Sequence, residues 1–122
     1  MAQPLKLPYL NVVMLAGRLV ADPHKLDASG REGSAFTLAI NRTVGRGKPA
    51  ISTFVDVVVF GDTATACNTY LAKGSAVMVT GSLANYERKR EKGPATKTLQ
   101  VSAAAVQFLS PKPEQPEDEA PE

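Results

Sequence analysis

Hydrophobic residues alternate with other residues in several segments of the chain, a pattern typical of β-strands whose two faces differ. Residues 54–60, FVDVVVF, place three valines on one face of such a strand, namely Val55, Val57 and Val59. The other face carries Phe54, Asp56, Val58 and Phe60. The valines predict a buried face, whereas two aromatic rings beside a carboxylate indicate a face with another role.

Four more segments have strand patterns. The run from Tyr9 to Ala21 is apolar on both faces and contains Gly17, and residues 34–42 follow after turn-forming residues at 22–33. The later strands are expected at residues 75–87 and 96–109. Their predicted core positions are Val77, Val79 and Leu83 in the first and Leu99, Val101 and Ala103 in the second.

A helix is expected between the third and fourth strands. In residues 62–74, Ala64, Cys67 and Leu71 recur at helical spacing, Asp62 can cap the start and Gly74 can end the helix. Three strands, a helix and two strands are the order of the all-β OB-fold, a five-stranded Greek-key barrel. An α+β sandwich is the alternative, and glycines inside long strands favour the barrel.

The composition fits one soluble domain of 122 residues, with 43% hydrophobic and 21% charged residues. No apolar run approaches the roughly 18 residues that a membrane span needs. The N-terminal residues lack a signal-peptide pattern, and the single cysteine has no partner for an internal disulfide. We therefore expect a cytoplasmic protein without membrane contact.

Charge divides the chain into two parts. Residues 111–122, PKPEQPEDEAPE, hold five acidic side chains and one basic one, while the remaining residues have a net charge of +6. We expect residues 1–110 to form the OB-fold domain and residues 111–122 to be a disordered, proline-rich acidic tail. A basic body suggests a polyanionic partner, and the tail either competes with that partner or only keeps the protein soluble.

Several phrases resemble the bacterial single-stranded-DNA-binding protein family. They are NVVMLAGRLVADP, FTLAINR, FVDVVVFGDTA, YLAKGSAVMVTGSL and KTLQVSA, in this order between about Asn11 and Leu109. The resemblance implies an OB-fold that assembles, usually as a tetramer, and wraps single strands without strong sequence preference. It also implies roles in DNA replication, recombination and repair.

The expected site residues follow from the resemblance together with the clustering of basic residues in two predicted hairpins. Phe54 and Phe60 match base-stacking positions of the family, and Tyr86 is expected to supply a third stacking plane. The expected phosphate-binding residues are Arg18, Arg42, Arg46, Lys48, Lys73, Arg88, Lys89, Arg90, Lys92 and Lys97. Tryptophan is absent, and Val44 and Arg88 stand where many members have aromatic residues, so we expect a larger dependence on charge. The tail ends without the aromatic residue that docks into replication and repair proteins, so such partners are not carried over.

Nothing in the sequence indicates catalysis, a metal or a cofactor. His24 is the only histidine and lies in a turn segment, and Cys67 lies on the apolar stripe of the helix. Two other functions remain open. One is a primosomal-type OB adaptor that oligomerises and binds DNA weakly, and the other is an RNA-binding OB protein of the cold-shock kind.

Overall fold

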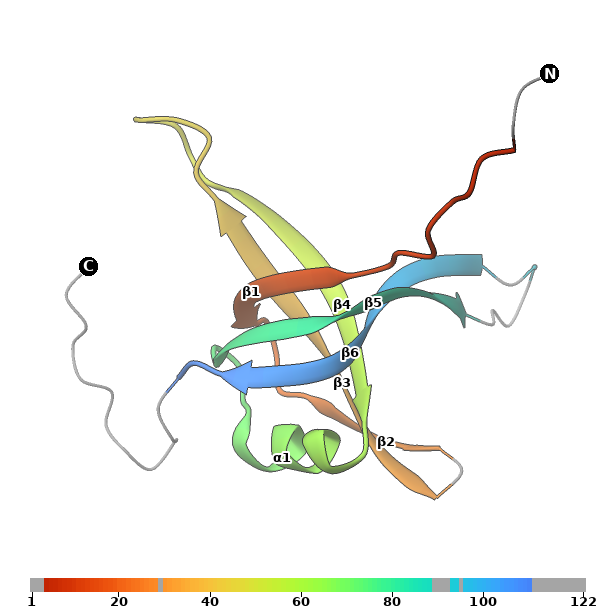
Figure 1. Cartoon of the computed structure of the whole chain (residues 1–122). Helices are drawn as coiled ribbons and strands as arrows, with labels where there is room; N and C mark the ends of the chain where they lie inside the picture. Colours follow the sequence, from red (N-terminus) through yellow and green to blue (C-terminus); the bar gives the residue numbers. More distant parts are fainter. Residues whose placement is uncertain (1–3, 29, 89–92, 95, 111–122) are drawn as a thin grey trace.

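The computed structural model describes residues 4–28, 30–88, 93–94 and 96–110 (Figure 1). The predicted tail and three of the predicted basic residues, Lys89, Arg90 and Lys92, lie outside the described residues. The elements are β1 (Val13–Leu19), β2 (His24–Ala28), β3 (Arg31–Arg42), β4 (Ile51–Phe60), α1 (Asp62–Tyr70), β5 (Ala76–Arg88) and β6 (Thr96–Phe108).

Five of the strands close into a barrel. The order along the sheet is β1-β5-β6-β4-β3-β2, and β1 also pairs with β3 through Arg18–Ala39 and Leu19–Leu38. This second pairing of β1 closes the sheet on itself, and α1 lies at one end of the barrel (Figure 1). The predicted OB-fold, with its helix between the third and fourth barrel strands, is confirmed.

The strand β2 is an addition to the predicted order. It pairs antiparallel with β3 from His24–Ala35 to Ala28–Arg31, where the sequence pattern predicted only turns. Leu26 is the one large apolar residue of β2, so the segment lacks the alternation that would reveal a strand. Its backbone hydrogen bonds to β3 hold it in place as an extra hairpin on the barrel.

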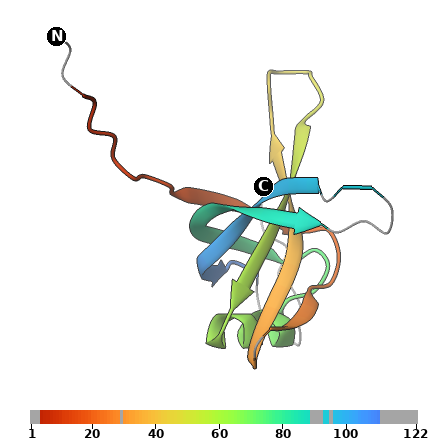
Figure 2. The same cartoon turned by 90° about the vertical axis from the view of Figure 1, so that its right-hand side faces the viewer.

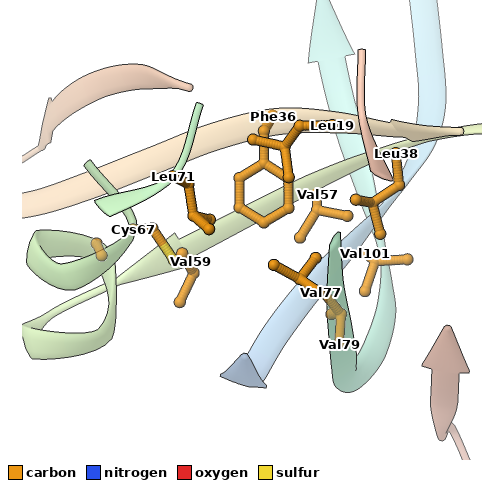
Figure 3. Packing of buried hydrophobic residues seen from close by; sticks show 11 residues of the cluster. Leu19, Phe36, Leu38, Val57, Val59, Cys67, Leu71, Val77, Val79 and Val101 are labelled. Carbon is orange, nitrogen blue, oxygen red and sulfur yellow. The ribbon is translucent and has the colours of Figure 1, made fainter. Parts of the chain in front are cut away.

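The barrel interior is filled from all five strands. Val57 and Val59 of β4, Phe36 and Leu38 of β3, and Val77 and Val79 of β5 are buried. Figure 3 shows these side chains gathered with those of Leu19, Val101, Cys67 and Leu71. The valine face of the segment at residues 54–60 is therefore the core face, as predicted.

Two glycines lie where the barrel strands approach closely. A Cβ atom on Gly17 would lie 2.5 Å from the carbonyl oxygen of Ala39, and one on Gly81 would lie 2.1 Å from the carbonyl oxygen of Ser102. A bulge between Thr80 and Gly81 shifts the β5–β6 register, so the pair Thr80–Ala105 is followed by Gly81–Ala103. The glycines thus allow the closure that their positions in the sequence indicated.

Two residues near the ends of β5 and β6 that were predicted to lie in the core are exposed. Leu83 is 45% exposed and Leu99 is 63% exposed, so their assignment to the core was wrong. In the described residues β4 pairs with β6 at Val57–Val101 and Val58–Ser102. Leu83 is the Cα partner of Val101 at this contact, and Leu99 lies beyond it, where no further pairing of β6 with β4 is described.

The helix is shorter than predicted but buries the expected stripe. It begins at Asp62 after Gly61, without a side-chain capping hydrogen bond, and ends at Tyr70, so the predicted roles of Asp62 as a cap and Gly74 as the end were wrong. Ala64, Cys67 and Leu71 are buried as expected.

Glu32 ties the helix to β3. Its carboxylate accepts hydrogen bonds from Asn68 Nδ2 at 2.9 Å and the Thr65 hydroxyl at 2.8 Å. These hydrogen bonds lower the pKa of the Glu32 carboxyl group, and the one from Asn68 has the larger effect.

Candidate nucleic-acid interface

Large and small side chains face each other on the outer side of β3 and β4. The Cα partners in this register are Phe54 with Ala39, Asp56 with Thr37, Val58 with Ala35, and Phe60 with Gly33. The small residues of β3 leave space beside the aromatic residues of β4. Phe54 is 65% exposed, so its ring is open to a ligand rather than covered by a loop of its own chain.

Phe60 is only partly exposed because its ring rests on the neighbouring strand. A Cβ atom on Gly33 would lie 2.6 Å from Phe60 Cε1, which means that the ring lies closely over the glycine backbone. The Arg31 guanidinium carbon lies 5.6 Å from the ring centroid, within the range of a cation–π interaction. These contacts fix the ring and leave part of it toward the solvent.

Phe60 and Tyr86 line the same groove. This hollow has a volume of about 520 Å³. Tyr86, near the end of β5, is 43% exposed. The other residues along it include His24, Leu26, Val58, Asp56 and Gln100. The structure therefore brings two of the three predicted stacking residues together, and it adds β2 to the wall, which the sequence did not indicate.

Phe54 lines a second, smaller groove of about 280 Å³ with Leu83 and Leu99. Asn11 fixes the backbone of Leu83, because its Nδ2 donates to the Leu83 carbonyl at 2.9 Å and its Oδ1 accepts from the Leu83 N–H at 2.8 Å. These two leucines are site residues that the sequence interpretation assigned to the core. Asp56 and Gln100 line both grooves and so lie between them.

A basic hairpin projects beyond the barrel beside this face. The strands β3 and β4 remain paired as far as Arg42–Ile51, and the loop between them carries Arg46 and Lys48 (Figure 2). Arg42, Arg46 and Lys48 are all exposed. Phe54 lies three residues after Ile51, the first residue of β4, so it is close in sequence to the loop that carries Arg46 and Lys48.

The second predicted basic cluster is described in part. Lys97 is exposed on β6, at the end of β6 that carries Leu99. Arg88 ends β5, with Thr96 as its Cα partner, and its side chain lies outside what the structure describes.

Arg18 and Lys73 lie elsewhere on the barrel. Arg18 pairs with Ala76 at the start of β5, whereas Tyr86 lies ten residues further along that strand. The Arg18 Nη1 donates to the Gly74 carbonyl at 2.7 Å, and the Lys73 backbone N–H donates to the Asp22 carboxylate at 2.8 Å. Arg18 thus has a structural partner, and the two residues do not join the grooves.

Cys67 is buried in the core and lines neither groove. Burial raises the pKa of the Cys67 thiol to about 11, so the group stays protonated near neutral pH. Among the described residues there is no group of three or more His, Cys, Asp or Glu side chains that could hold a metal ion. In the same part of the chain, no helix has the length and apolar character needed to cross a membrane.

Comparison with known proteins shows which family the chain resembles. Residues 10–109 match the model of the single-strand binding protein family. The chain is 36% identical over 105 residues to single-stranded DNA-binding protein 1 of Staphylococcus aureus strain MSSA476, covering 84% of this chain and 67% of that protein. It is 38% identical over 105 residues to the protein of that name from strain COL, with 84% of this chain and 63% of the relative covered.

A solved structure shares the fold. The Plasmodium falciparum SSB in complex with ssDNA superposes with a TM-score of 0.71, covering 86% of this chain and 99% of that chain. The two sequences are 23% identical, so this likeness concerns the barrel architecture.

Proposed function

Because the chain belongs to the single-strand binding protein family, we propose that it binds single-stranded DNA with little dependence on sequence and protects it in replication, recombination and repair. The observation that carries the proposal is the placement of Phe54, Phe60 and Tyr86 along two adjacent grooves on the outside of the barrel. An aromatic ring can stack on any base, which supplies affinity without sequence preference.

Titration of a fluorescent oligothymidine at two salt concentrations tests this function. We expect tight binding at low salt that weakens as salt rises, and much weaker binding of a duplex of the same length. Equal binding of oligouridine would favour the RNA-binding alternative. An absence of salt-dependent binding would favour the OB adaptor.

The basic hairpin is proposed to follow the phosphate backbone. Arg46→Gln combined with Lys48→Gln should reduce the slope of log affinity against log salt by about 0.7 for each phosphate group that the variant no longer neutralises. Lys6→Gln, in the segment before β1, is the control and should leave the slope unchanged. An unchanged slope in the double variant would mean that other residues bind the phosphate groups.

We further propose that the protein assembles through β1, as a tetramer by resemblance to the family. Val12, just before β1, and Met14 on its outer face are each 64% exposed. The neighbouring Ala16 pairs with Met78 of β5, which continues the apolar surface. In the described residues β3 pairs with β1 at Arg18 and Leu19 and lies close to Gly17, so the edge of β1 from Val13 to Ala16 is available to another strand. Both features suit a subunit contact.

Met14→Glu should dissociate this assembly, since a carboxylate would be buried without a partner. Sedimentation of the wild-type protein should give a multiple of the 12.9 kDa chain mass, and the variant should approach one chain. Lys6 precedes the strand, so Lys6→Glu serves as a control for an added negative charge outside it. A wild-type protein that sediments as a single chain at micromolar concentration contradicts the proposal.

The remaining parts of the proposal rest on the sequence. Residues 111–122, with a net charge of −4, are proposed to compete with DNA at low salt for Arg46 and Lys48 of the basic hairpin and for Arg88, Lys89 and Arg90 of the second basic cluster. The protein is proposed to act in the cytoplasm as a binding protein without turnover.

A further inference from the structure

Asp56 occupies an unusual place for a surface that is to bind a polyanion. It lies between the two grooves and lines both, with Phe54 on one side along β4 and Phe60 on the other. A carboxylate at this position repels phosphate groups, so its presence there needs a reason other than affinity for the DNA backbone.

The carboxylate is held in position. The Thr37 hydroxyl, directly opposite on β3, donates a hydrogen bond of 2.7 Å to Asp56 Oδ1. An ionised carboxylate has two oxygens with about four acceptor positions, so one hydrogen bond leaves capacity on both oxygens. Asp56 is exposed, and that capacity faces solvent or a ligand.

Which base such an acceptor binds best depends on the hydrogen-bond donors at the edge of each base. Guanine presents two adjacent donors, N1–H and the 2-amino group, which fit the two oxygens of a carboxylate. Cytosine and adenine each present one amino group, and thymine presents a single N3–H between two carbonyl oxygens that a carboxylate repels. Single-stranded bases expose these edges when they are stacked on aromatic side chains.

We propose that Asp56 accepts hydrogen bonds from the edge of a base stacked in either groove and gives the site a preference for guanine over thymine. This inference rests on the proposed function. Stacking on Phe54, Phe60 and Tyr86 binds every base, and the carboxylate adds a modest preference to that binding. Gln100, which also lines both grooves, has an amide that both donates and accepts, so it discriminates less between bases.

The test compares three labelled oligonucleotides of one length. The first is all thymine, the second has guanine at every third position, and the third has hypoxanthine there, which keeps N1–H but lacks the 2-amino group. The wild-type protein should bind the guanine oligonucleotide about twofold to fivefold more tightly than oligothymidine. The hypoxanthine oligonucleotide should fall between them.

Two variants and one control complete the test. Asp56→Asn should bring the ratio of guanine to thymine affinity close to one and tighten the binding of oligothymidine. Thr37→Val keeps the charge but loses the hydrogen bond that positions it, so the ratio should fall part of the way. Asp27→Asn removes an equal charge from β2, at a residue outside both grooves, and should leave the ratio unchanged.

The outcomes separate this inference from the proposed function. If Asp56→Asn tightens all three oligonucleotides by one factor, Asp56 only repels phosphate and the inference is wrong. A wild-type protein that binds all three equally also overturns it, while the proposed function stands. If none of the three binds, both fail.

Discussion

A Phe54→Ala variant is expected to bind a single-stranded oligonucleotide about 5-fold to 150-fold more weakly than the wild-type protein, the loss that corresponds to about 1–3 kcal/mol for one stacked base. The ring is 65% exposed and lines a groove with two other exposed apolar residues, Leu83 and Leu99. Its removal therefore takes away a ligand surface and leaves the barrel core intact. Fluorescence anisotropy at fixed salt measures the change.

Two further variants identify the interaction. Phe54→Leu keeps an apolar side chain but loses the flat π-face, so it should recover little of the affinity if stacking is the cause. Tyr70→Ala is the matched control, because Tyr70 is a half-exposed aromatic residue on α1, where it packs edge to face against Phe108 with ring centroids 6.5 Å apart. Its removal should leave DNA affinity unchanged.

A different result would assign Phe54 to another surface. If Phe54→Ala leaves the affinity unchanged but lowers the sedimentation coefficient, the ring lies in a contact between subunits. If the variant unfolds, the faces of β4 have been misassigned. Val57→Ala, on the buried face, provides the reference for a core substitution and should lower the free energy of unfolding by about 1–3 kcal/mol.

The alternation of side chains predicted the parts of this fold that depend on one strand at a time. Val57 and Val59 are in the core and Phe54 is outside because a strand directs successive side chains to opposite faces. The helical stripe of Ala64, Cys67 and Leu71 followed from helical spacing in the same way. The barrel followed from the order of elements and from glycines inside long strands.

Features that depend on two strands were not predictable from one sequence pattern. Val101 and Val106 of β6 both pack against the core, although strict alternation places them on opposite faces. The bulge opposite Thr80 and Gly81 adds one residue to β6 between Val101 and Val106, which reverses the alternation of side chains and brings both valines to the same face. Similarly, the exposure of Leu83 and Leu99 depends on where β4 leaves β6, which no local pattern records. The grooves therefore had to be located from the structure.

Gly81→Ala is expected to destabilise the protein by about 1–3 kcal/mol or more, because the added methyl group meets atoms that cannot rotate away. The Cβ position lies 2.1 Å from the Ser102 carbonyl oxygen and 2.9 Å from Ala103 Cα, both backbone atoms of β6. The strands must separate at the bulge, which breaks hydrogen bonds on both sides of it. Thermal unfolding at one protein concentration should show a midpoint lowered by roughly 5–20 °C.

Gly45→Ala is the matched control for the same chemical change. Gly45 lies in the loop between β3 and β4, where a Cβ atom would meet the Lys48 side chain at 3.6 Å, an ordinary contact with a flexible group. The free energy of unfolding of the Gly45→Ala variant should stay within about 0.5 kcal/mol of the wild-type value. Gly81→Ala should also weaken DNA binding in the folded fraction, because the bulge sets the course of β5 toward Leu83 and Tyr86. A Gly81→Ala protein with wild-type stability would mean that β5 and β6 are further apart at this point than the closed barrel requires.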